Sequence, residues 1–258
     1  MTIITLTTDF GSADGYVGTM KGVILGIAPD VRLVDLSHEI AAQDVRGAEY
    51  VLGRAAAFFP AGTVHLAVVD PGVGSRRRPL LVTTPRARYV GPDNGLFTFA
   101  LAEAGVAVFE LDRPEFCLPN ISRTFHGRDI FAPVAAHVAR GVAPHALGSP
   151  ISDPVRLPAV APQRRADGSI TGRVVHVDHF GNLITDIPGG WMGEGRWCVE
   201  IAGRRINRFG TTYADATAGA LLILVSSAGT LEIAAREGNA AALLGVGVGE
   251  AAILEPIA

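Results

Sequence analysis

The stretch IITLTTDFG, residues 3–11, sets the pattern on which the predicted fold rests. Its β-branched residues predict a strand over Ile3–Thr8 that ends at an acidic turn beginning with Asp9. Apolar residues then follow at helical spacing: Tyr16, Met20, Val23, Ile24 and Ile27. Pro29 ends that helix, because proline cannot continue the hydrogen-bond ladder. The chain therefore opens as a strand followed by a helix.

The same alternation continues through the first half of the chain. Further strands are predicted over Val31–Leu36, Thr63–Val69 and Leu80–Thr84. Further helices are predicted over Asp44–Phe58, Leu96–Ala104 and Ile130–Arg140. Strands that alternate with helices are typical of an α/β fold, in which a mostly parallel sheet is flanked by helices.

The pattern changes near Val142. Residues Ala143–Pro162 contain five prolines and little periodicity, which predicts a linker or an extended strap. The segments that follow are short, rich in β-formers and separated by turns: Ile170–Asp178, Trp197–Ile201, Arg204–Phe209, Leu221–Val225, Thr230–Ala234 and Ala251–Leu254. We therefore expect an N-terminal α/β domain over residues 1–155 and a smaller β-barrel-like domain over residues 166–258.

Composition narrows the class of protein. The 258 residues are 48% hydrophobic and 18% charged, with a formal net charge of -3. Arg76–Arg78 is too short a basic tract for a nucleic-acid partner. Cys117 and Cys198 lie far apart, which argues against a disulfide framework or a cysteine metal site. No signal peptide and no membrane-spanning run is apparent, so a soluble cytoplasmic protein without a membrane partner is expected.

Two acidic residues follow apolar strands directly. Asp9 and Asp70 each lie just past the carboxyl end of a predicted strand, where open α/β sheets bind ligands. Aspartates at such ends also serve as turn formers or helix caps, so placement alone leaves both interpretations open.

Two motifs in the first half carry candidate chemistry. In the loop Asp70–Arg77, glycines allow a tight turn and the two charges can face each other. In Phe125–Asp129, His126 lies before a helix, where its neighbours can orient it for proton handling. We expect Asp129 to be the N-cap of that helix and Arg128 to be structural. The plainer alternative for each motif is an ordinary surface turn.

Two motifs in the second half suit a purine ligand. In Asp178–Asn182, the amide of Asn182 offers a donor and an acceptor and Phe180 offers a stacking face. The segment around Ser227, followed by Glu232 and Asn239–Ala240, is either a plain strand, turn and strand or part of a site. Glu232 then meets either a ligand cation or solvent.

The sequence offers weaker support for three other functions. Asp9, Asp70, Asp93, His126 and Asp129 include the donor types of a two-metal phosphoesterase, but no tight ligand spacing supports one. The glycines of Gly245–Gly249 suggest a dinucleotide loop, yet too little chain follows for a βαβ unit. A nucleoside-binding protein without catalytic activity is the remaining alternative.

Taken together, these motifs resemble one family, the S-adenosyl-L-methionine (SAM) hydroxide adenosyltransferases, which are related to the fluorinases and chlorinases. The resemblance covers nearly the whole chain, and it rests on the order and spacing of these segments: Thr8–Gly11, Val69–Gly74, Gly91–Gly95, Phe125–Asp129, Phe180–Asn182 and Asn239–Ala241.

The resemblance implies an N-terminal α/β domain, a β-rich C-terminal domain, and a homotrimer whose sites lie between subunits. The family's water-activating Asp, Arg and His match Asp70, Arg77 and His126, and its ribose-binding Asp matches Asp9. Arg76 and Arg78 flank Arg77, so a shift of one position stays open. The remaining substrate contacts are expected at Phe125, Asp178, Phe180, Asn182, Ser227, Glu232, Asn239 and Ala240.

The halogenating relatives differ at decisive positions. They carry Tyr in place of Asp70, Thr in place of Val73, and Tyr-Ser in place of His126–Gly127. The carboxylate of Asp70 would repel a halide, and Gly127 supplies no hydroxyl to hold one. The resemblance therefore implies hydrolysis of SAM to adenosine and L-methionine by water attack at the ribose C5′, with no cofactor and no metal. Halogenation stays the alternative, and the final proton acceptor is either Asp70 or, as we favour, His126.

Overall fold

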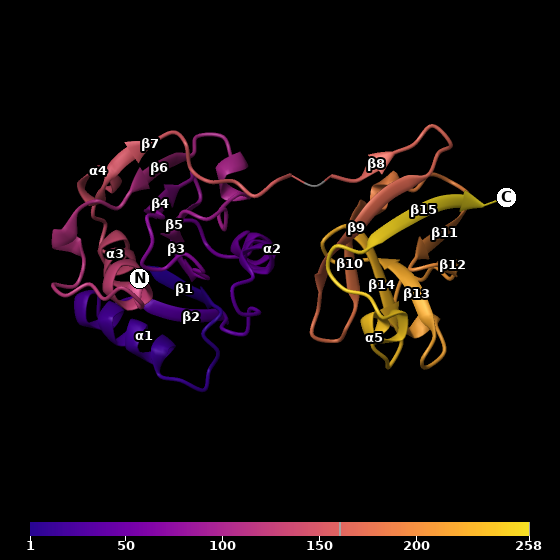
Figure 1. Ribbon diagram of the computed structural model, residues 1–258, viewed down its shortest axis with the longest axis horizontal. Helices are drawn as coiled ribbons and strands as arrows, with labels where there is room; N and C mark the ends of the chain where they lie inside the picture. Colours follow the sequence, from indigo (N-terminus) through magenta and orange to yellow (C-terminus); the bar gives the residue numbers. More distant parts are fainter. Residues whose placement is uncertain (160, 258) are drawn as a thin grey trace. The chain divides into compact units, whose positions relative to one another are not determined.

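The chain folds into two compact units, Met1–Pro158 and Ala159–Ala258, in a computed structural model that describes residues 1–159 and 161–257 (Figure 1). Each unit is built around its own β-sheet. The predicted fold class, an α/β unit followed by a barrel-like β unit, is confirmed. The boundary lies after Pro158, because the segment before it is hydrogen-bonded into the first unit: Val155 N donates to Asp93 Oδ1 and Leu157 N donates to Thr98 Oγ1.

The first unit contains a seven-stranded sheet in the order β2-β1-β3-β5-β4-β6-β7. Its strands are β1 (Ile3–Thr8), β2 (Arg32–Ser37), β3 (Thr63–Val68), β4 (Pro79–Thr83), β5 (Ala87–Pro92), β6 (Ala107–Glu110) and β7 (Ser149–Ile151). The predicted parallel arrangement holds for β2, β1, β3 and β5, whereas β4, β6 and β7 add antiparallel pairs. Every residue of the central strand β3 is buried, which explains its continuous apolar character.

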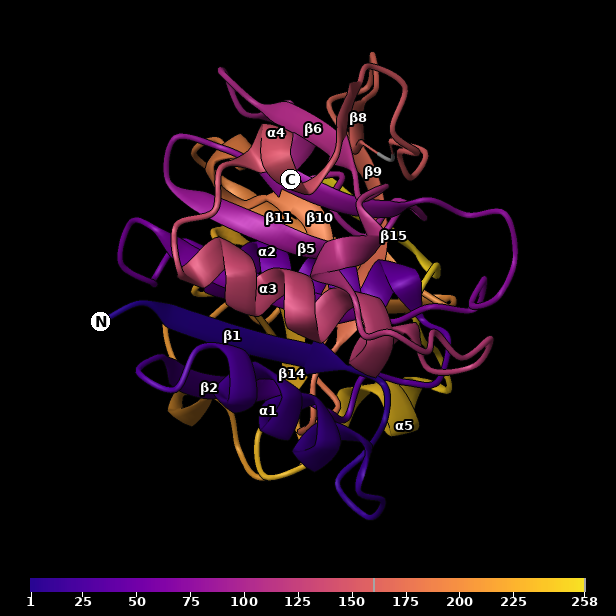
Figure 2. The same ribbon diagram turned by 90° about the vertical axis from the view of Figure 1, so that its left-hand side faces the viewer.

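Helices cover both faces of this sheet. They are α1 (Tyr16–Ile27), α2 (Val45–Ala56), α3 (Ala132–Ala139) and the short α4 (Pro144–Leu147), with 3-10 turns at Ala100–Ala102 and Pro114–Phe116 and a π-helical turn at Gly127–Phe131. Helices α1 and α3 pack on one face and α2 on the other (Figure 2). Asp44 caps α2, where its carboxylate accepts from Gly47 N at 2.8 Å. None of the helices among the described residues is long and apolar enough to cross a bilayer.

The predicted helix over Leu96–Ala104 is wrong. The segment consists instead of successive hydrogen-bonded turns, with a 3-10 turn at Ala100–Ala102, and its Leu96, Phe97 and Leu101 side chains are buried. The Thr98 hydroxyl donates to Gly95 O at 2.6 Å and tightens the chain just after a glycine with a positive φ. The apolar spacing therefore reflects the burial of consecutive turns, which periodicity alone does not distinguish from a short α-helix.

The prediction of a linker or strap over Ala143–Pro162 is wrong for its first half. That half forms α4 and the edge strand β7, which pairs antiparallel with β6. Pro144 occupies the first turn of α4, where no backbone donor is needed. Pro150 lies on the edge strand, where a missing N–H is tolerated. The prolines that suggested a linker are thus compatible with regular structure at these two positions.

The second unit is an antiparallel sheet in the order β12-β11-β15-β9-β10-β14-β13, with β8 also pairing with β9. Its elements are β8 (Gln163–Arg164), β9 (Ile170–Val177), β10 (Leu183–Pro188), β11 (Arg196–Ile201), β12 (Arg204–Ile206), β13 (Leu221–Val225), β14 (Thr230–Ala235), α5 (Ala240–Leu244) and β15 (Ala251–Ile257), with 3-10 turns at Gly189–Trp191 and Tyr213–Asp215. Gly210 N donates to Ile223 O at 2.9 Å, and this bond joins the chain after β12 to β13, the other end of the sheet. The sheet therefore closes into a barrel-like form.

A buried histidine lies in the centre of the first sheet. His65, on β3, is fully buried and stacks on Tyr89 with ring centroids 5.1 Å apart. Its Nδ1 lies 2.7 Å from the Thr5 hydroxyl, and its Nε2 has no hydrogen-bond partner among the residues that the structure describes. Burial lowers the pKa of His65 to about 4, from its ordinary value of 6.5. The ring is therefore neutral in the folded protein at neutral pH.

We expect His65 to make the fold sensitive to acid. Between pH 6.5 and about 4 the unfolded chain binds a proton at this residue that the folded chain does not. The free energy of unfolding should therefore fall as pH drops through this window, by up to about 3 kcal/mol. Urea unfolding at pH 7 and pH 5 would measure the loss. In the double variant Thr5→Val/His65→Phe, which removes both polar partners, the loss should shrink; an unchanged loss would assign the acid sensitivity to other groups.

Candidate functional site

The first candidate site lies at the carboxyl ends of β1 and β3, which are parallel neighbours. Asp9 follows β1 and Asp70 follows β3 by one residue beyond its end. The two acidic residues that the sequence singled out therefore lie at the same edge of the sheet, as expected for adjacent parallel strands. One oxygen of Asp9, Oδ2, accepts from Gln43 N at 2.8 Å.

The loop after Asp70 returns Arg77 to that carboxylate. Backbone turns fold the loop, with Val73 N donating to Asp70 O at 3.1 Å. Arg77 Nε then donates to Asp70 Oδ1 and Oδ2 at 2.9 and 3.0 Å, and Arg77 Nη2 donates to Oδ2. The Asp70 and Arg77 side chains are only 5% and 9% exposed, so this ion pair is shielded from water. Of the three successive arginines, Arg77 is the one that pairs with Asp70, because Arg78 pairs instead with Asp93 and Arg76 is exposed.

Arg77 also reaches His126. Its Nη2 lies 2.7 Å from His126 Nδ1, and a guanidinium has donors only, so Nδ1 must accept. His126 is thereby neutral, with its proton on Nε2. Burial, and then the nearby Arg77 charge, lower the pKa of His126, which favours the same neutral form. Arg77 thus bridges an anionic and a neutral group in a fixed geometry.

A cavity of about 400 Å³ lies in the first unit beside the groups that Arg77 bridges. Asp9, Asp70, Phe125 and His126 all contribute to it, with Gln43 and Tyr16 as lining residues that sequence reasoning missed. The rings of Phe10, Tyr16 and Phe125 pack against one another, with centroids 5.1 to 5.9 Å apart. The cavity therefore combines the carboxylates of Asp9 and Asp70 with a cluster of three aromatic rings, which suits a cationic ligand that carries an apolar part.

Three of the four acidic residues considered as metal ligands, Asp70, Asp93 and Asp129, are each paired with an arginine, whereas Asp9 accepts from Gln43 N. Arg78 donates to Asp93 at 2.8 Å, and Arg128 donates to Asp129 at 2.6 Å. Asp129 is therefore not the predicted N-cap: it lies inside the helical turn, fully buried, and also accepts from Ser122 N. Within residues 1–159 and 161–257, no three His, Cys, Asp or Glu side chains are grouped so as to hold a metal ion.

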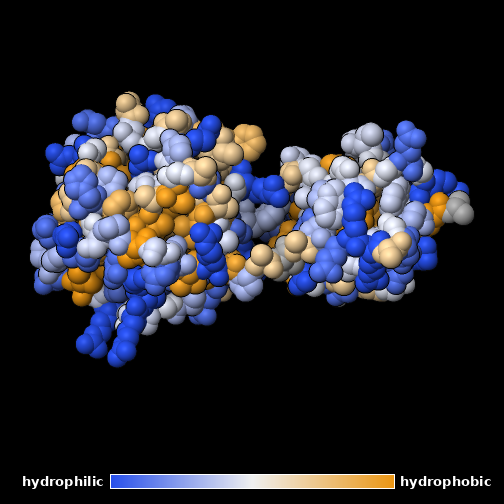
Figure 3. Space-filling model, turned by 90° about the horizontal axis from the view of Figure 1, so that it is seen from above, coloured by the Kyte–Doolittle hydropathy of each residue, from blue (hydrophilic) through white to orange (hydrophobic). Residues whose placement is uncertain are grey.

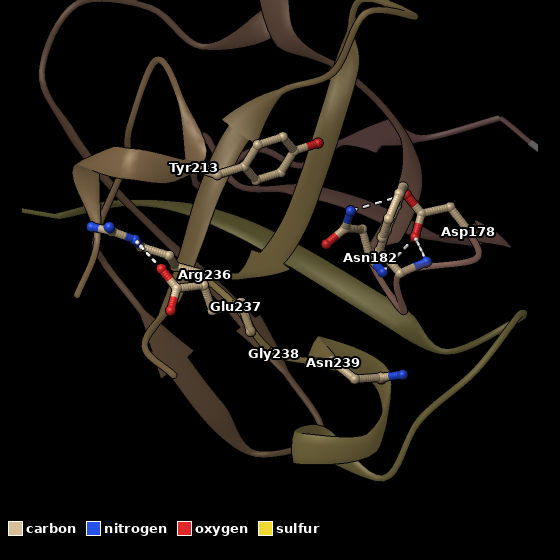
Figure 4. Close-up of a pocket in the computed structure, with 9 residues that line it drawn as sticks. Asp178, Asn182, Tyr213, Arg236, Glu237, Gly238 and Asn239 are labelled. Atoms are coloured by element: carbon tan, nitrogen blue, oxygen red, sulfur yellow. Dashed lines mark hydrogen bonds and ion pairs between the residues drawn. The ribbon is translucent and has the colours of Figure 1, made fainter. Parts of the chain in front are cut away.

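A second candidate cavity, of about 710 Å³, lies in the second unit. Figure 4 shows Tyr213 on one side of it and Asp178 and Asn182 on the other. Asp178 organises its own turn, because its carboxylate accepts from Phe180 N, Asn182 N and Asn182 Nδ2 at 2.8 to 2.9 Å. The Phe180 ring is left 73% exposed at the rim.

Asn239 completes this cavity next to the turn. It caps α5, since its Oδ1 accepts from Ala242 N at 2.7 Å. Gly181 has a φ of 82° and lies so close that a Cβ there would overlap the Asn239 side chain. Ala241 N donates to Gly181 O at 2.9 Å and ties the two segments together. Ala240, another predicted contact, is fully buried at the start of α5.

Two predicted substrate contacts lie elsewhere in the second unit. Glu232 is buried and accepts from the Tyr213 hydroxyl at 2.7 Å, so solvent is not its main partner. Ser227 precedes β14, whereas Arg236 and Asn239, which line the cavity, follow it. Ser227 is therefore at the opposite end of that strand. Tyr213 was missed, although the capping box between Thr212 and Asp215 is a sequence signal for its short helix.

Two family models match this chain. The SAM hydroxide adenosyltransferase N-terminal domain matches residues 4–148, and the C-terminal domain of the same family matches residues 172–253. The chain belongs to the SAM hydroxide adenosyltransferase family.

Three similar proteins match most or nearly all of this chain. A protein of Salinispora arenicola named (R)-S-adenosyl-L-methionine hydrolase is 42% identical over 252 residues, which cover 96% of this chain and 95% of that protein. A fluorinase of an Actinoplanes species is 30% identical over 213 residues, 72% of this chain and 71% of that protein. The crystal structure of an uncharacterized conserved protein from Thermotoga maritima matches with a TM-score of 0.91 and 35% identity, over 98% of this chain and 99% of that one.

Proposed function

We propose that this protein hydrolyses SAM to adenosine and L-methionine through attack of water at the ribose C5′. The observation that carries the proposal is the Arg77 bridge between Asp70 and His126 at the edge of the cavity that also contains Asp9. A relative that covers almost the whole chain bears the name of an (R)-S-adenosyl-L-methionine hydrolase, and we extend that substrate, including its (R) sulfonium, to this chain.

The chemistry asks little of an acid catalyst. A bond forms between the water oxygen and C5′ while the C5′–S bond breaks, and its electron pair passes to the sulfonium, which leaves as the neutral thioether of methionine. One proton is released from the water. The protein must therefore align water with the C–S bond and increase its nucleophilicity, which proximity and charge-assisted hydrogen bonds achieve.

We assign His126 the role of donor, which revises our preference for it as proton acceptor. With Nδ1 occupied by Arg77, the ring offers Nε2–H to the water. A water that donates to Asp70 and accepts from His126 Nε2 keeps one lone pair for C5′. The proton then leaves late, towards Asp70 or solvent, once the oxygen is bonded to carbon and has become strongly acidic.

We expect turnover to be lost on the acid side only. The pKa of His126 is lowered, so the ring is neutral at pH 7; its protonation would place an N–H against Arg77 and break the bridge. The single-turnover rate should therefore be constant at and above the ordinary histidine pKa of 6.5 and fall only at lower pH, as the pH approaches the lowered pKa of His126. His126→Gln places an amide donor near the Nε2 position and cannot act as a base, so it should retain more activity than His126→Ala. Equal and complete loss of activity in His126→Gln and His126→Ala would show instead that His126 acts as the general base.

The second-unit cavity is proposed to hold adenine and the methionine portion. Asn182 and Asn239 supply amide groups, and Phe180 and Tyr213 supply stacking faces. Phe125 of the first cavity, together with Ser227 and Ala240, is retained as a proposed contact on the family resemblance alone. Glu232 is proposed to act through Tyr213.

We further propose a homotrimer with sites between subunits. Large apolar residues are exposed on both units, with Phe58 at 89% and Leu243 at 52%. Figure 3 shows apolar side chains, in orange, gathered on the visible face of the first unit. Apolar surface of this kind favours association. Reduced Cys117 and Cys198 support a cytoplasmic location, and we propose neither a metal nor a cofactor.

Product analysis tests the reaction. Purified protein is incubated with each sulfonium epimer of SAM in H₂¹⁸O, with and without halide and chelator. Hydrolysis predicts adenosine labelled at the 5′ oxygen, equimolar methionine, faster reaction of the (R) epimer, and no effect of the chelator. A 5′-halo-adenosine would support a halogenase, loss with chelator would support a metalloenzyme, and adenosine binding without methionine release would leave a nucleoside-binding protein.

A further inference from the structure

The turn that carries Asp9 is fastened to a second loop by His38. Gly11 N donates to His38 O at 2.8 Å, and the His38 ring nitrogen Nδ1 lies 2.9 Å from the Thr8 hydroxyl. Phe10 N donates to the same hydroxyl at 3.2 Å. One residue thus holds the turn before and after Asp9, by side chain and by backbone.

The other nitrogen of the His38 ring contacts Asp35, which in turn pairs with Lys21. His38 Nε2 lies 2.9 Å from Asp35 Oδ1, and Lys21 donates to Asp35 Oδ2 at 2.6 Å. The Asp35 carboxylate can only accept, so the proton of the neutral His38 ring lies on Nε2; Nδ1 then accepts from the Thr8 hydroxyl, which itself accepts from Phe10 N. Thr8 is fully buried and the His38 side chain is only 11% exposed, so water competes little for these bonds.

The loop that begins at His38 also makes the contact to Asp9 itself. Gln43 N donates to Asp9 Oδ2 at 2.8 Å, and Gln43 has a φ of 67°, a left-handed conformation that a non-glycine residue rarely adopts. Such strain persists only where the surroundings over-determine the backbone. The loop from His38 to Gln43 is therefore hydrogen-bonded to the Asp9 turn at both ends of the loop: His38 contacts Thr8 and Gly11, and Gln43 contacts Asp9.

We propose that His38 is a positioning residue for the nucleoside of the substrate. Acting through Thr8 and the backbone of the turn, it fixes the Asp9 carboxylate where the ribose hydroxyls bind, and it fixes the Phe10 ring against Phe125 in the cavity wall. Asp35 and Lys21 serve this function by orienting the imidazole. The inference rests on the proposed function, because it assigns Asp9 to the ribose of SAM.

The experiment pairs variants with a substrate that lacks the hydroxyls. His38→Ala, His38→Asn, Asp9→Ala and, as a matched control in the same two loops, Ser12→Ala are compared on SAM and on its 2′,3′-dideoxyribose analogue. Ser12 donates to Glu39 at 3.1 Å in an exposed hydrogen bond. His38→Ala should lower kcat/KM for SAM by about 10-fold or more, mainly through KM, and by less than about 2-fold for the analogue. His38→Asn, which still offers an acceptor to Thr8, should recover part of the loss, and Ser12→Ala should match the wild type.

Each outcome decides the matter. An equal loss of kcat/KM on both substrates, or no loss on either, would overturn the positioning role, and circular dichroism of each variant verifies that the fold is intact. If the wild type releases no adenosine from SAM, the proposed function fails. The same variants are then compared by calorimetry on adenosine and 2′,3′-dideoxyadenosine, where a preference for adenosine that disappears in His38→Ala supports the role of His38, and a preference that persists or is absent in the wild type overturns it.

Discussion

Arg77→Ala is expected to reduce single-turnover hydrolysis of SAM by about 10³-fold, because it removes the donor that links both water-handling groups. Arg77 holds Asp70 through three contacts and sets the tautomer of His126 through a fourth. Its loss leaves a buried carboxylate unpaired, which also costs about 3–5 kcal/mol of stability. The rate must therefore be measured where the variant is folded, as verified by urea unfolding.

Two neighbouring variants separate geometry from charge. Arg76→Ala removes an exposed arginine one position away and should leave the rate unchanged. Arg77→Lys keeps a positive charge but lacks the planar fork that reaches Asp70 and His126 together, so it should stay at least about 10²-fold below the wild type. Full activity in Arg77→Lys would show that charge alone suffices and that the bridge is not needed.

The parts of the fold that the sequence predicted are those with strong local signals. The β-branched run before Asp9 and the stop at Pro29 locate β1 and α1 closely. The sequence does not predict strands β5, β6 and β10, because pairing with neighbouring strands, and not their own periodicity, defines them; β5 and β10 are as long as β1. Pro144 and Pro150 wrongly suggested a linker for a related reason. Each lies where its missing N–H breaks no hydrogen bond, and that depends on its position in the folded protein.

The candidate site divides in the same way. Adjacent parallel strands bring Asp9 and Asp70 to one edge, so strand order was enough to predict their proximity. Strand order does not predict which of the three successive arginines pairs with Asp70, because that depends on how the loop after Asp70 turns. The role of His126 depends on which nitrogen meets Arg77, a fact of geometry that no spacing in the sequence encodes. Gln43 acts through its backbone N–H, and His38 acts through its ring and its backbone carbonyl; neither residue belongs to a motif that the sequence shows.

Gly181→Ala is expected to damage the second cavity most. The residue has a φ of 82°, and a Cβ there would overlap the Asn239 side chain. The left-handed backbone costs an alanine about 1 kcal/mol, and displacement of Asn239 removes the N-cap of α5 for about 1 kcal/mol more. Because Asn239 also lines the cavity, KM for SAM should rise about 10-fold or more while the aligned water, held by the first unit, keeps kcat within a few-fold.

Gly203→Ala is the matched control for that prediction. Gly203 has a φ of 70° and nothing within 4 Å of a Cβ, so it carries the same backbone penalty without the collision. Its KM should stay at the wild-type value although its melting temperature falls. A double variant isolates the cause further: in an Asn239→Ala background the obstacle is gone, so Gly181→Ala should add little to KM. If Gly181→Ala raises KM equally in both backgrounds, the turn itself and not Asn239 makes the contact with substrate, and the second cavity owes its shape to the backbone of Asp178–Asn182.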